Sequence, residues 1–342
     1  MHDMKSRHSL LYDRYDRVFE KMKMVYGPVP SRRLGRSLGV NPIPLKTCNY
    51  SCVYCQLGRT AHITNQRQDF FSPEEILGEI KSAIEIKDGR GDGEIDFVTF
   101  IGEGEPTLCK SIGWLIRKTR EIADIPIAVD TNGSLLYRED VRNDLSQADV
   151  VMPSLDAGTA ETFRKINRPH REIGFKKVVE GMEQFRQEYA GEIWVEVMLV
   201  KGVNDSEKEL KAIRSRLEKI EPDRIYINVP IRPPAESWVI PPDNETIASA
   251  HAILGDGNVV DIAAEETGEF SIEGFTNPKD AILAIIRRHP MRENQVIETL
   301  KKVEVRNLHD DLKKLEKSGK IKKVKYREKV FWLAVEEKKG YD

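Results

Sequence analysis

The sequence has little of several features that define whole classes of protein. Only 7% of its 342 residues are aromatic. Only four residues are cysteine, which is too few for a disulfide scaffold. The longest apolar runs, such as residues 281–286, fall far short of the ~18 residues that a bilayer span needs. Residues 1–24 contain no apolar segment of the kind that forms a secretory signal. We therefore expect a cytoplasmic protein without membrane contact.

What the chain does have is a core-forming composition and an uneven charge. It is 39% apolar and 32% charged, which suits one domain of ~250 residues and a small additional module. Residues 277–342 contain 18 Lys and Arg against 11 Asp and Glu, a net charge of +7, whereas the rest of the chain carries −9. A basic segment on an acidic body indicates two modules with different partners. An ordinary solvated helical surface explains the same charge equally well.

Strand-like and helix-like segments alternate over residues 31–235. Helices are expected at about 73–88, 110–123, 138–146, 160–190 and 206–219, with a break near Pro169 and Gly174 in the fourth. Strands are expected at about 37–45, 95–101, 126–130, 149–155, 192–200 and 223–230. Six strands that alternate with helices predict parallel strands with crossover helices. We expect an α/β fold with a partial (β/α)6 barrel of the TIM type, and a doubly wound sheet is the alternative.

Three further segments flank this predicted barrel. Residues 1–30 are expected to form an N-terminal helical extension, because apolar side chains recur there at helical spacing. Residues 236–276 are rich in proline at their start and are expected to form a cap and linker. Residues 277–336 contain three predicted helices followed by a β-hairpin, which is the arrangement of a winged-helix (α+β) domain.

Three cysteines lie in a short loop just after the first predicted barrel strand. Cys48, Cys52 and Cys55 have the spacing C-x3-C-x2-C, and three thiolates this close together can hold one metal centre. Structural zinc usually takes four ligands in two separated pairs, and the fourth cysteine, Cys109, is far along the chain. A [4Fe–4S] cluster with three protein ligands leaves one iron free to bind a small molecule. The spacing favours this cluster, although zinc and an inert trio remain open alternatives.

Residues 44–58 resemble the signature of the radical S-adenosylmethionine (SAM) superfamily, including Tyr54 just before the third cysteine. The resemblance implies that the three cysteines hold a [4Fe–4S] cluster and that Tyr54 contacts the adenine of SAM. It also covers Gly104, Glu105 and Pro106 at the end of the second strand, where the family's motif lines the methionine amino group. Glu103 stands where the family has another glycine.

Later strand ends supply the remaining candidate residues. By the same resemblance, Asn132 after the third strand and Ser154 and Asp156 after the fourth face the cofactor. Alternation along a strand puts Ser154 and Asp156 on one face. Strands five and six contribute the predicted substrate contacts, which are Glu196, Asn228 and Arg232. The three arginines at 32, 33 and 36 either bind an anion or form ion pairs at a strand border, and the second interpretation is slightly favoured.

The resemblance implies an enzyme that cleaves SAM reductively to a 5′-deoxyadenosyl radical, which abstracts hydrogen from a substrate. An external one-electron donor of the flavodoxin or ferredoxin type would reduce the cluster. Residues 25–58 and 102–107 resemble archaeal iron–sulfur oxidoreductases related to wyosine synthases. Those synthases carry a second cluster on further cysteines that this chain lacks, so we do not predict their reaction. The substrate is unassigned, and RNA is the candidate.

A hypothesis from a different class is a redox-sensing regulator that binds nucleic acid. In it, the helix over residues 304–311 would enter a groove, with Lys322, Lys323, Lys325 and Lys329 on the wing. The basic module could instead dock RNA or a protein. The strand-end motifs discriminate between the hypotheses, because a sensor has no use for a Gly-Glu-Pro segment or an Asn-Gly turn beside the cysteines.

Overall fold

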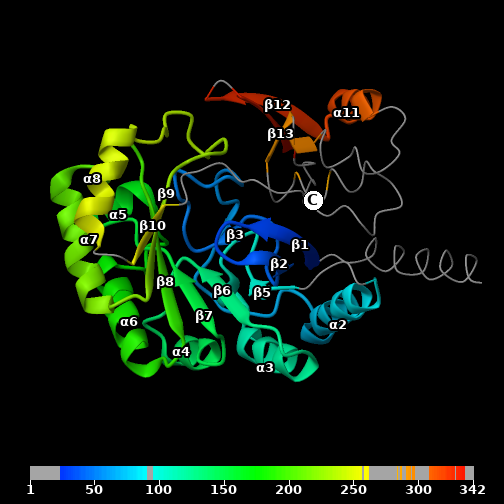
Figure 1. Ribbon diagram of the computed structural model, residues 1–342, viewed down its shortest axis with the longest axis horizontal. Coiled ribbons are helices and arrows are strands. Elements are labelled where there is room, and N and C mark those ends of the chain that lie inside the picture. Colours follow the sequence, from blue (N-terminus) through cyan, green and yellow to red (C-terminus); the bar gives the residue numbers. More distant parts are fainter. Residues whose placement is uncertain are drawn as a thin grey trace, which may run out of the picture.

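The fold is known from a computed structural model that describes residues 24–90, 95–255, 258–261, 283, 286, 290–293, 295–296, 308–327 and 329–335. Its centre is an eight-stranded sheet with the strand order β1-β2-β5-β6-β7-β8-β9-β10 (Figure 1). Strand β1 (Val25–Ser31) is antiparallel to β2 (Gly35–Val40), and every later neighbour is parallel. The other strands are β5 (Phe97–Phe100), β6 (Ile127–Thr131), β7 (Val150–Pro153), β8 (Glu192–Met198), β9 (Arg224–Asn228) and β10 (Val259–Asp261).

Helices follow the strands and cover the outer face of the curved sheet, as Figure 1 shows. They are α2 (Pro73–Arg90), α3 (Ile112–Ile122), α4 (Glu139–Leu145), α5 (Ala160–Ile166), α6 (Phe175–Glu188), α7 (Glu207–Ile220) and α8 (Asn244–Leu254). The predicted α/β partial barrel is therefore confirmed, and the alternative of a doubly wound sheet is wrong. Within the described ranges, no helix has both the length and the apolar character to cross a bilayer.

Local capping explains where these helices begin. The side chains of Thr159, Ser206 and Asp243 accept hydrogen bonds from the backbone N–H three residues ahead, at the starts of α5, α7 and α8. Each satisfies a donor that the first helical turn leaves without a partner. The break predicted near Pro169 and Gly174 is confirmed, because α5 ends at Ile166 and α6 begins at Phe175.

Two apolar clusters hold the barrel together. The larger one lies between the sheet and its helices and includes Phe100, Ile116 and Val129, all fully buried. The smaller one is a floor inside the barrel, formed by Leu34, Ala128, Val150, Met152, Trp194 and Tyr226, with Phe97 packed against it. Burial on both faces explains why the strands read as continuous apolar runs in the sequence.

The N-terminal part differs from the prediction. Residues 1–23 of the expected helix lie outside the described residues, whereas Val25–Ser31 form strand β1. Its sequence, VYGPVPS, lacks the regular alternation that marks a strand, and Gly27 has a φ of +99°, which favours glycine. Pairing with β2 makes this segment a strand, so the cause is a tertiary contact.

The C-terminal region has its own small sheet, in the antiparallel order β11-β13-β12. Its strands are β11 (Met291–Arg292), β12 (Ile321–Tyr326) and β13 (Lys329–Ala334), and helix α11 (Leu308–Lys317) precedes the hairpin. The expected helices over 279–289 and 292–300 lie mostly outside the described residues. Val29 of β1 packs against the core of this region, and the Tyr326 hydroxyl donates to the Pro230 carbonyl oxygen at 3.0 Å. The small sheet therefore touches both sides of the barrel.

Substitution of Phe100 by alanine tests the position of the main core. Phe100 is fully buried in a central strand, so we expect Phe100→Ala to lower the free energy of unfolding by about 3–5 kcal/mol. Ile240→Ala is the control, because Ile240 is 48% exposed, and it should cost less than about 0.5 kcal/mol. Urea unfolding followed by circular dichroism measures both. Equal losses would contradict this assignment of the core.

Candidate functional site

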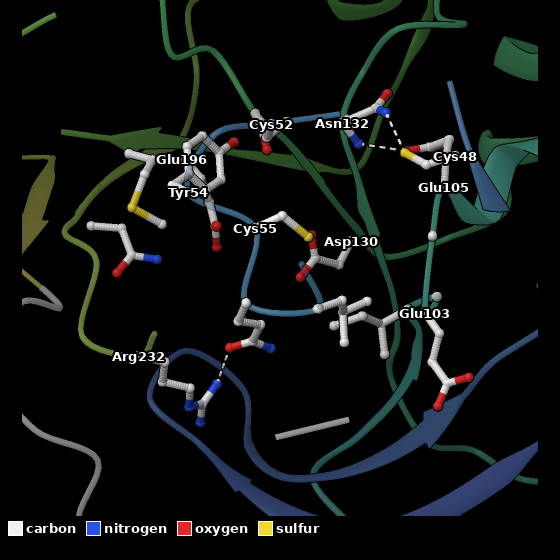
Figure 2. A pocket seen from close by; sticks show the side chains of 18 of the residues that line it. Cys48, Cys52, Tyr54, Cys55, Glu103, Glu105, Asp130, Asn132, Glu196 and Arg232 are labelled. Atoms are coloured by element: carbon white, nitrogen blue, oxygen red, sulfur yellow. Dashed lines mark hydrogen bonds between the residues drawn. The ribbon is translucent and has the colours of Figure 1, made fainter. Parts of the chain in front are cut away.

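One cavity of about 360 Å³ opens inside the barrel, beside the loop that carries the three cysteines (Figure 2). Nearly all of the residues that the sequence singled out line it. They are Cys48, Cys52, Tyr54, Cys55, Gly104, Glu105, Asn132, Ser154, Asp156, Glu196, Asn228 and Arg232. Pro106 is the exception, because it is buried at the start of a short 3-10 helix (Pro106–Leu108). Residues spread over 185 positions are thus gathered in one place.

The inner wall changes from apolar to polar at one level of the barrel. On each strand from β5 to β9, the last residue of the floor is followed, two positions later, by a polar residue on the same face of the strand. These residues form the polar layer of the cavity, which consists of Thr99, Asp130, Ser154, Glu196 and Asn228. The floor therefore closes the cavity from below, and the polar layer lies between the floor and the cysteines.

The cysteine loop is held by a distant segment, residues 166–170, which follows α5. Ser51 N–H donates to the Asn167 carbonyl at 3.0 Å, and Val53 N–H donates to the Ile166 carbonyl at 2.9 Å. In the opposite direction, His170 N–H donates to the Asn49 carbonyl at 2.7 Å. This pairing fixes the backbone between the first and second cysteines.

A salt-bridge cluster around Glu236 adds a second tie to the same loop. Glu236 N–H donates to the Val53 carbonyl at 3.1 Å. Its carboxylate accepts a bidentate contact from Arg59 at 2.8 and 3.0 Å and another from Arg168 at 2.5 Å. The hydrogen bonds from Arg59 and Arg168, together with the positive charge of both guanidinium groups, lower the pKa of Glu236. Glu236 therefore lies against the cysteine loop.

The segment of Gly104, Glu105 and Pro106 packs directly on strand β3 (Thr47–Cys48), which carries the first cysteine. A Cβ at Gly104 would overlap the Thr47 carbonyl oxygen, so only glycine fits there. The Glu105 carboxylate is buried and accepts hydrogen bonds from Thr107, from the Thr131 hydroxyl at 2.6 Å and from Asn132 N–H at 2.7 Å. Burial raises the pKa of Glu105, while these donors oppose the shift. In this arrangement Glu105 anchors the turn after β6.

Asp156 organises the opposite side of the cavity. Its carboxylate accepts a 2.5 Å hydrogen bond from the Tyr54 hydroxyl, one at 2.7 Å from the Asn167 amide and one at 2.9 Å from Met198 N–H. Burial raises the pKa of Asp156, and the three donors work against that rise. Asp156 thus fixes the ring of Tyr54 beside the second and third cysteines.

Asparagine amides contact two of the cysteine sulfurs. Asn132 Nδ2 lies 3.7 Å from Cys48 Sγ, as Figure 2 shows, and Asn167 Nδ2 lies 3.5 Å from Cys52 Sγ. The sequence pointed to Asn132 through its Asn-Gly turn. It gave no signal for Asn167, whose side chain reaches a cysteine 115 positions earlier in the chain.

Burial keeps the three thiols protonated in the protein without a bound group. Desolvation raises the pKa of Cys48 from an ordinary 9.0 to about 12, and it also raises the pKa values of Cys52 and Cys55. Nearby carboxylates, Glu105 at Cys48 and Asp156 at Cys52, add to the shift. Among the described residues, no three His, Cys, Asp or Glu side chains surround a single metal-ion position. The sulfurs line the cavity at separate points.

The sequence favoured ion pairs for the arginines at 32, 33 and 36 but did not indicate their partners, and for Arg33 these lie in the polar layer. Arg33, from the turn between β1 and β2, contacts Asp130 at 3.1 Å and also pairs with Glu196. All three side chains are largely buried, and burial raises the pKa of Asp130 despite the guanidinium beside it. Of the two interpretations of the arginines at 32, 33 and 36, ion pairing at a strand border is therefore the better one for Arg33. Its ion pairs, however, lie inside the cavity.

The remaining candidates lie at the rim or outside the site. Arg232 donates to the Gln56 side chain at 2.5 Å, so it bridges the cysteine loop and the segment after β9. Glu103 lines the cavity, and in Figure 2 its side chain extends away from the cysteines. Cys109 is buried behind the 3-10 helix and does not line the cavity.

Comparisons with known proteins point to one superfamily. The profile of the Radical SAM superfamily matches residues 43–212. A UPF0026 protein of Methanocaldococcus jannaschii is 40% identical over 317 residues, which are 91% of this chain and 96% of that protein. A protein of Brachyspira hyodysenteriae named GTPase Obg is 38% identical over 88% of this chain and 44% of its own length. Among solved structures, a radical SAM methyltransferase from Sphaerobacter thermophilus is 17% identical, with a TM-score of 0.49 over 64% of this chain and 63% of that one.

The raised pKa of Cys48 predicts a slow reaction of the cluster-free protein with iodoacetamide. Only the thiolate reacts, and a pKa of about 12 leaves about a thousandfold less thiolate at pH 8 than the ordinary value of 9.0 does. We expect alkylation of Cys48, followed by mass spectrometry, to be slower than that of free cysteine by a factor of this order. The rate should rise with pH until the pH reaches the pKa.

Unfolding the same protein in urea serves as the control, because it removes the desolvation and should restore the ordinary rate. Rapid alkylation of folded protein at pH 8 would show that the thiol is not desolvated in this way.

Proposed function

The chain belongs to the radical SAM superfamily and to its UPF0026 group, and we propose that it uses a [4Fe–4S] cluster to cleave SAM and abstract hydrogen from an RNA substrate. The cofactors of this superfamily are the cluster and SAM, and the chain is accordingly an enzyme. The observation that carries the proposal is that three cysteines of one loop and three further strand-end motifs line a single cavity.

The residues of the cavity fit the cluster. Cys48, Cys52 and Cys55 come from one loop whose backbone is already held by residues 166–170. Their protonated thiols must lose protons to bind iron, so cluster binding releases protons and weakens as the pH falls. Three protein ligands leave one iron for the amino and carboxylate groups of SAM.

The protein's own groups position SAM and keep water away. In this proposal Tyr54 contacts the adenine, with its hydroxyl held by Asp156, while the segment at Gly104 and Glu105, which packs closely on the Thr47 carbonyl, faces the methionine moiety. Asn132, Ser154 and Asp156 supply polar contacts on the same wall. When both cofactors are bound and an electron arrives, they supply a 5′-deoxyadenosyl radical that takes a hydrogen atom from the substrate.

The polar layer is the proposed substrate side of the cavity. Glu196 and Asn228 belong to this layer, Arg232 lies at the rim above it, and the apolar floor beneath excludes solvent from the barrel end. An external donor of the flavodoxin or ferredoxin type supplies the electron. Residues 31–235 then form the catalytic domain, 236–276 the cap and 277–336 the substrate-docking module. The cytoplasmic location expected from the sequence stays a prediction.

The basic C-terminal region supports RNA as the substrate. Residues 313–329 contain nine Lys and Arg against two Asp and Glu, and most of the basic side chains are exposed. This region meets the barrel at Val29 and Pro230, both of which line the cavity. A polyanion bound there would lie beside the cavity mouth. Nothing in the fold or the comparisons supports the alternative of a redox-sensing regulator.

Anaerobic reconstitution with iron and sulfide tests the proposed chemistry. After addition of dithionite and SAM, we expect 5′-deoxyadenosine, detected by liquid chromatography and mass spectrometry. Cys55→Ala should lose both the bound iron and the product, because two remaining thiolates hold a cluster poorly. Cys109→Ala is the matched control, since Cys109 lies outside the cavity, and it should retain both. A loaded cluster that forms no 5′-deoxyadenosine would refute the proposal, and so would zinc in place of iron in anaerobically isolated protein.

Filter binding at several salt concentrations tests the RNA partner. We expect transfer RNA to bind with an affinity that falls steeply as the salt concentration rises, because phosphate contacts release counterions. A variant with Lys320, Lys322 and Arg327 changed to alanine should bind more weakly and with a salt slope that is smaller by about two to three.

The control replaces three exposed lysines on helices α6 and α7, namely Lys176, Lys208 and Lys219, and should leave binding unchanged. RNA binding that is undetectable or insensitive to salt would remove this partner. Capture of a protein by the same surface, without RNA binding, would favour the protein alternative.

A further inference from the structure

We propose that Asn132 and Asn167 donate N–H···S hydrogen bonds that raise the reduction potential of the iron–sulfur cluster. The inference rests on the proposed function, because it takes Cys48 and Cys52 as cluster ligands. It assigns Asn167 as a positioning residue that acts through Cys52, and it gives Asn132 an effect on Cys48 in addition to its proposed contact with SAM. For Asn167 no role follows from the sequence motifs.

Asn167 lies behind the cavity wall, where its amide donates to Cys52 and Asp156. It is 2% exposed, and its side chain does not line the cavity, so it is not a SAM contact. Its Nδ2 lies 3.5 Å from Cys52 Sγ and 2.7 Å from Asp156 Oδ2. The backbone of Asn167 also accepts from Ser51 N–H, directly beside Cys52. The amide is therefore fixed at both its backbone and its side chain.

The network determines which way each amide faces. Asp156 accepts hydrogen bonds, so the group that Asn167 turns toward it must be the NH2, and that same nitrogen faces the sulfur. The Asn132 Oδ1 accepts from Ser134 N–H at 2.9 Å, which leaves its NH2 for Asn49 Oδ1 at 2.8 Å and Cys48 Sγ at 3.7 Å. Flipping either amide would lose a buried hydrogen bond.

The two asparagines differ from the donors at the third cysteine. The hydrogen bonds at Cys55 come from backbone groups of Leu57 and Gly58, and the ammonium of Lys46 acts on it through its charge. Cys48 also has backbone donors, from Asn49 and Tyr50. Only Cys48 and Cys52, among the three, receive side-chain amides in the described structure. These donors can be removed by substitution without changing the backbone.

Hydrogen bonds to sulfur favour the reduced state of a cluster. Reduction adds negative charge that spreads onto the ligand sulfurs, and an N–H dipole stabilises that charge more strongly in the buried site than it would in water. Asn132 and Asn167 should therefore make the electron easier to accept. Their effect offsets that of the Glu105 and Asp156 carboxylates, which lie near the same sulfurs and disfavour the added negative charge of the reduced cluster.

The test is an anaerobic potentiometric titration of the reconstituted full-length protein, followed by electron paramagnetic resonance of the reduced cluster. We expect Asn167→Leu to keep its iron and sulfide but to lower the reduction potential. The expected change is about a tenfold smaller ratio of reduced to oxidised cluster at a fixed potential, which is about 59 mV for one electron.

Asn204→Leu is the matched control. Asn204 is also buried, and its amide donates to the Asp156 and Met198 carbonyls at 2.8 Å, but it has no sulfur partner in the described structure. Loss of the Asn204 amide should leave the reduction potential of the cluster unchanged. An equal potential for wild type and Asn167→Leu, both with full clusters, would overturn this inference while leaving the proposed function standing. Wild-type protein that takes up no cluster would instead refute the proposed function.

A second measurement needs no variant and decides the matter if Asn167→Leu does not fold. Wild-type protein is labelled with asparagine that carries ¹⁵N only in its side-chain amide, and the reduced cluster is examined by pulsed electron paramagnetic resonance. Amides in hydrogen-bond contact with the ligand sulfurs should give weak ¹⁵N hyperfine couplings. A spectrum without such couplings would overturn the inference.

Discussion

The site depends on backbone hydrogen bonds between the cysteine loop and a segment more than 110 residues later. Residues 166–170 pair with Asn49, Ser51 and Val53, and Glu236 ties the same loop to the cap. Because folding supplies these bonds, the conformational entropy of the loop is already lost before any group binds. The cysteines are thus arranged by the barrel.

Two stacked layers divide the barrel interior between stability and chemistry. The floor around Trp194 and Tyr226 is apolar and well packed. The layer above it, toward the cysteines, is polar and consists of Thr99, Asp130, Ser154, Glu196 and Asn228. Polar groups buried at this level are costly unless they are paired, and Arg33 pairs with two of the carboxylates. The same layering keeps the polar residues at the carboxyl ends of the strands, where barrel enzymes place their active sites.

The C-terminal region changes how the cavity meets the outside. The parallel sheet does not close in the described residues, since β1 and β10 are its two edges. The small sheet packs against Val29 on β1 and bonds to Pro230 after β9 through Tyr326. Its basic residues therefore lie near the open side of the barrel, which links the charge asymmetry of the sequence to the position of the cavity.

The sequence by itself determined the repeating strand–helix pattern, the cysteine trio and the strand-end residues, because periodicity and short spacings are local properties. Six predicted strands and most helices were confirmed, whereas β1 was missed because its pairing with β2 overrides a weak local pattern. Only the tertiary structure decided the role of Asn167, the tie from Glu236 to Arg59 and the insertion of Arg33 into the cavity. These contacts join residues 115, 177 and 97 positions apart. No local pattern encodes them, since they arise when parallel strands bring their ends to one edge of the sheet.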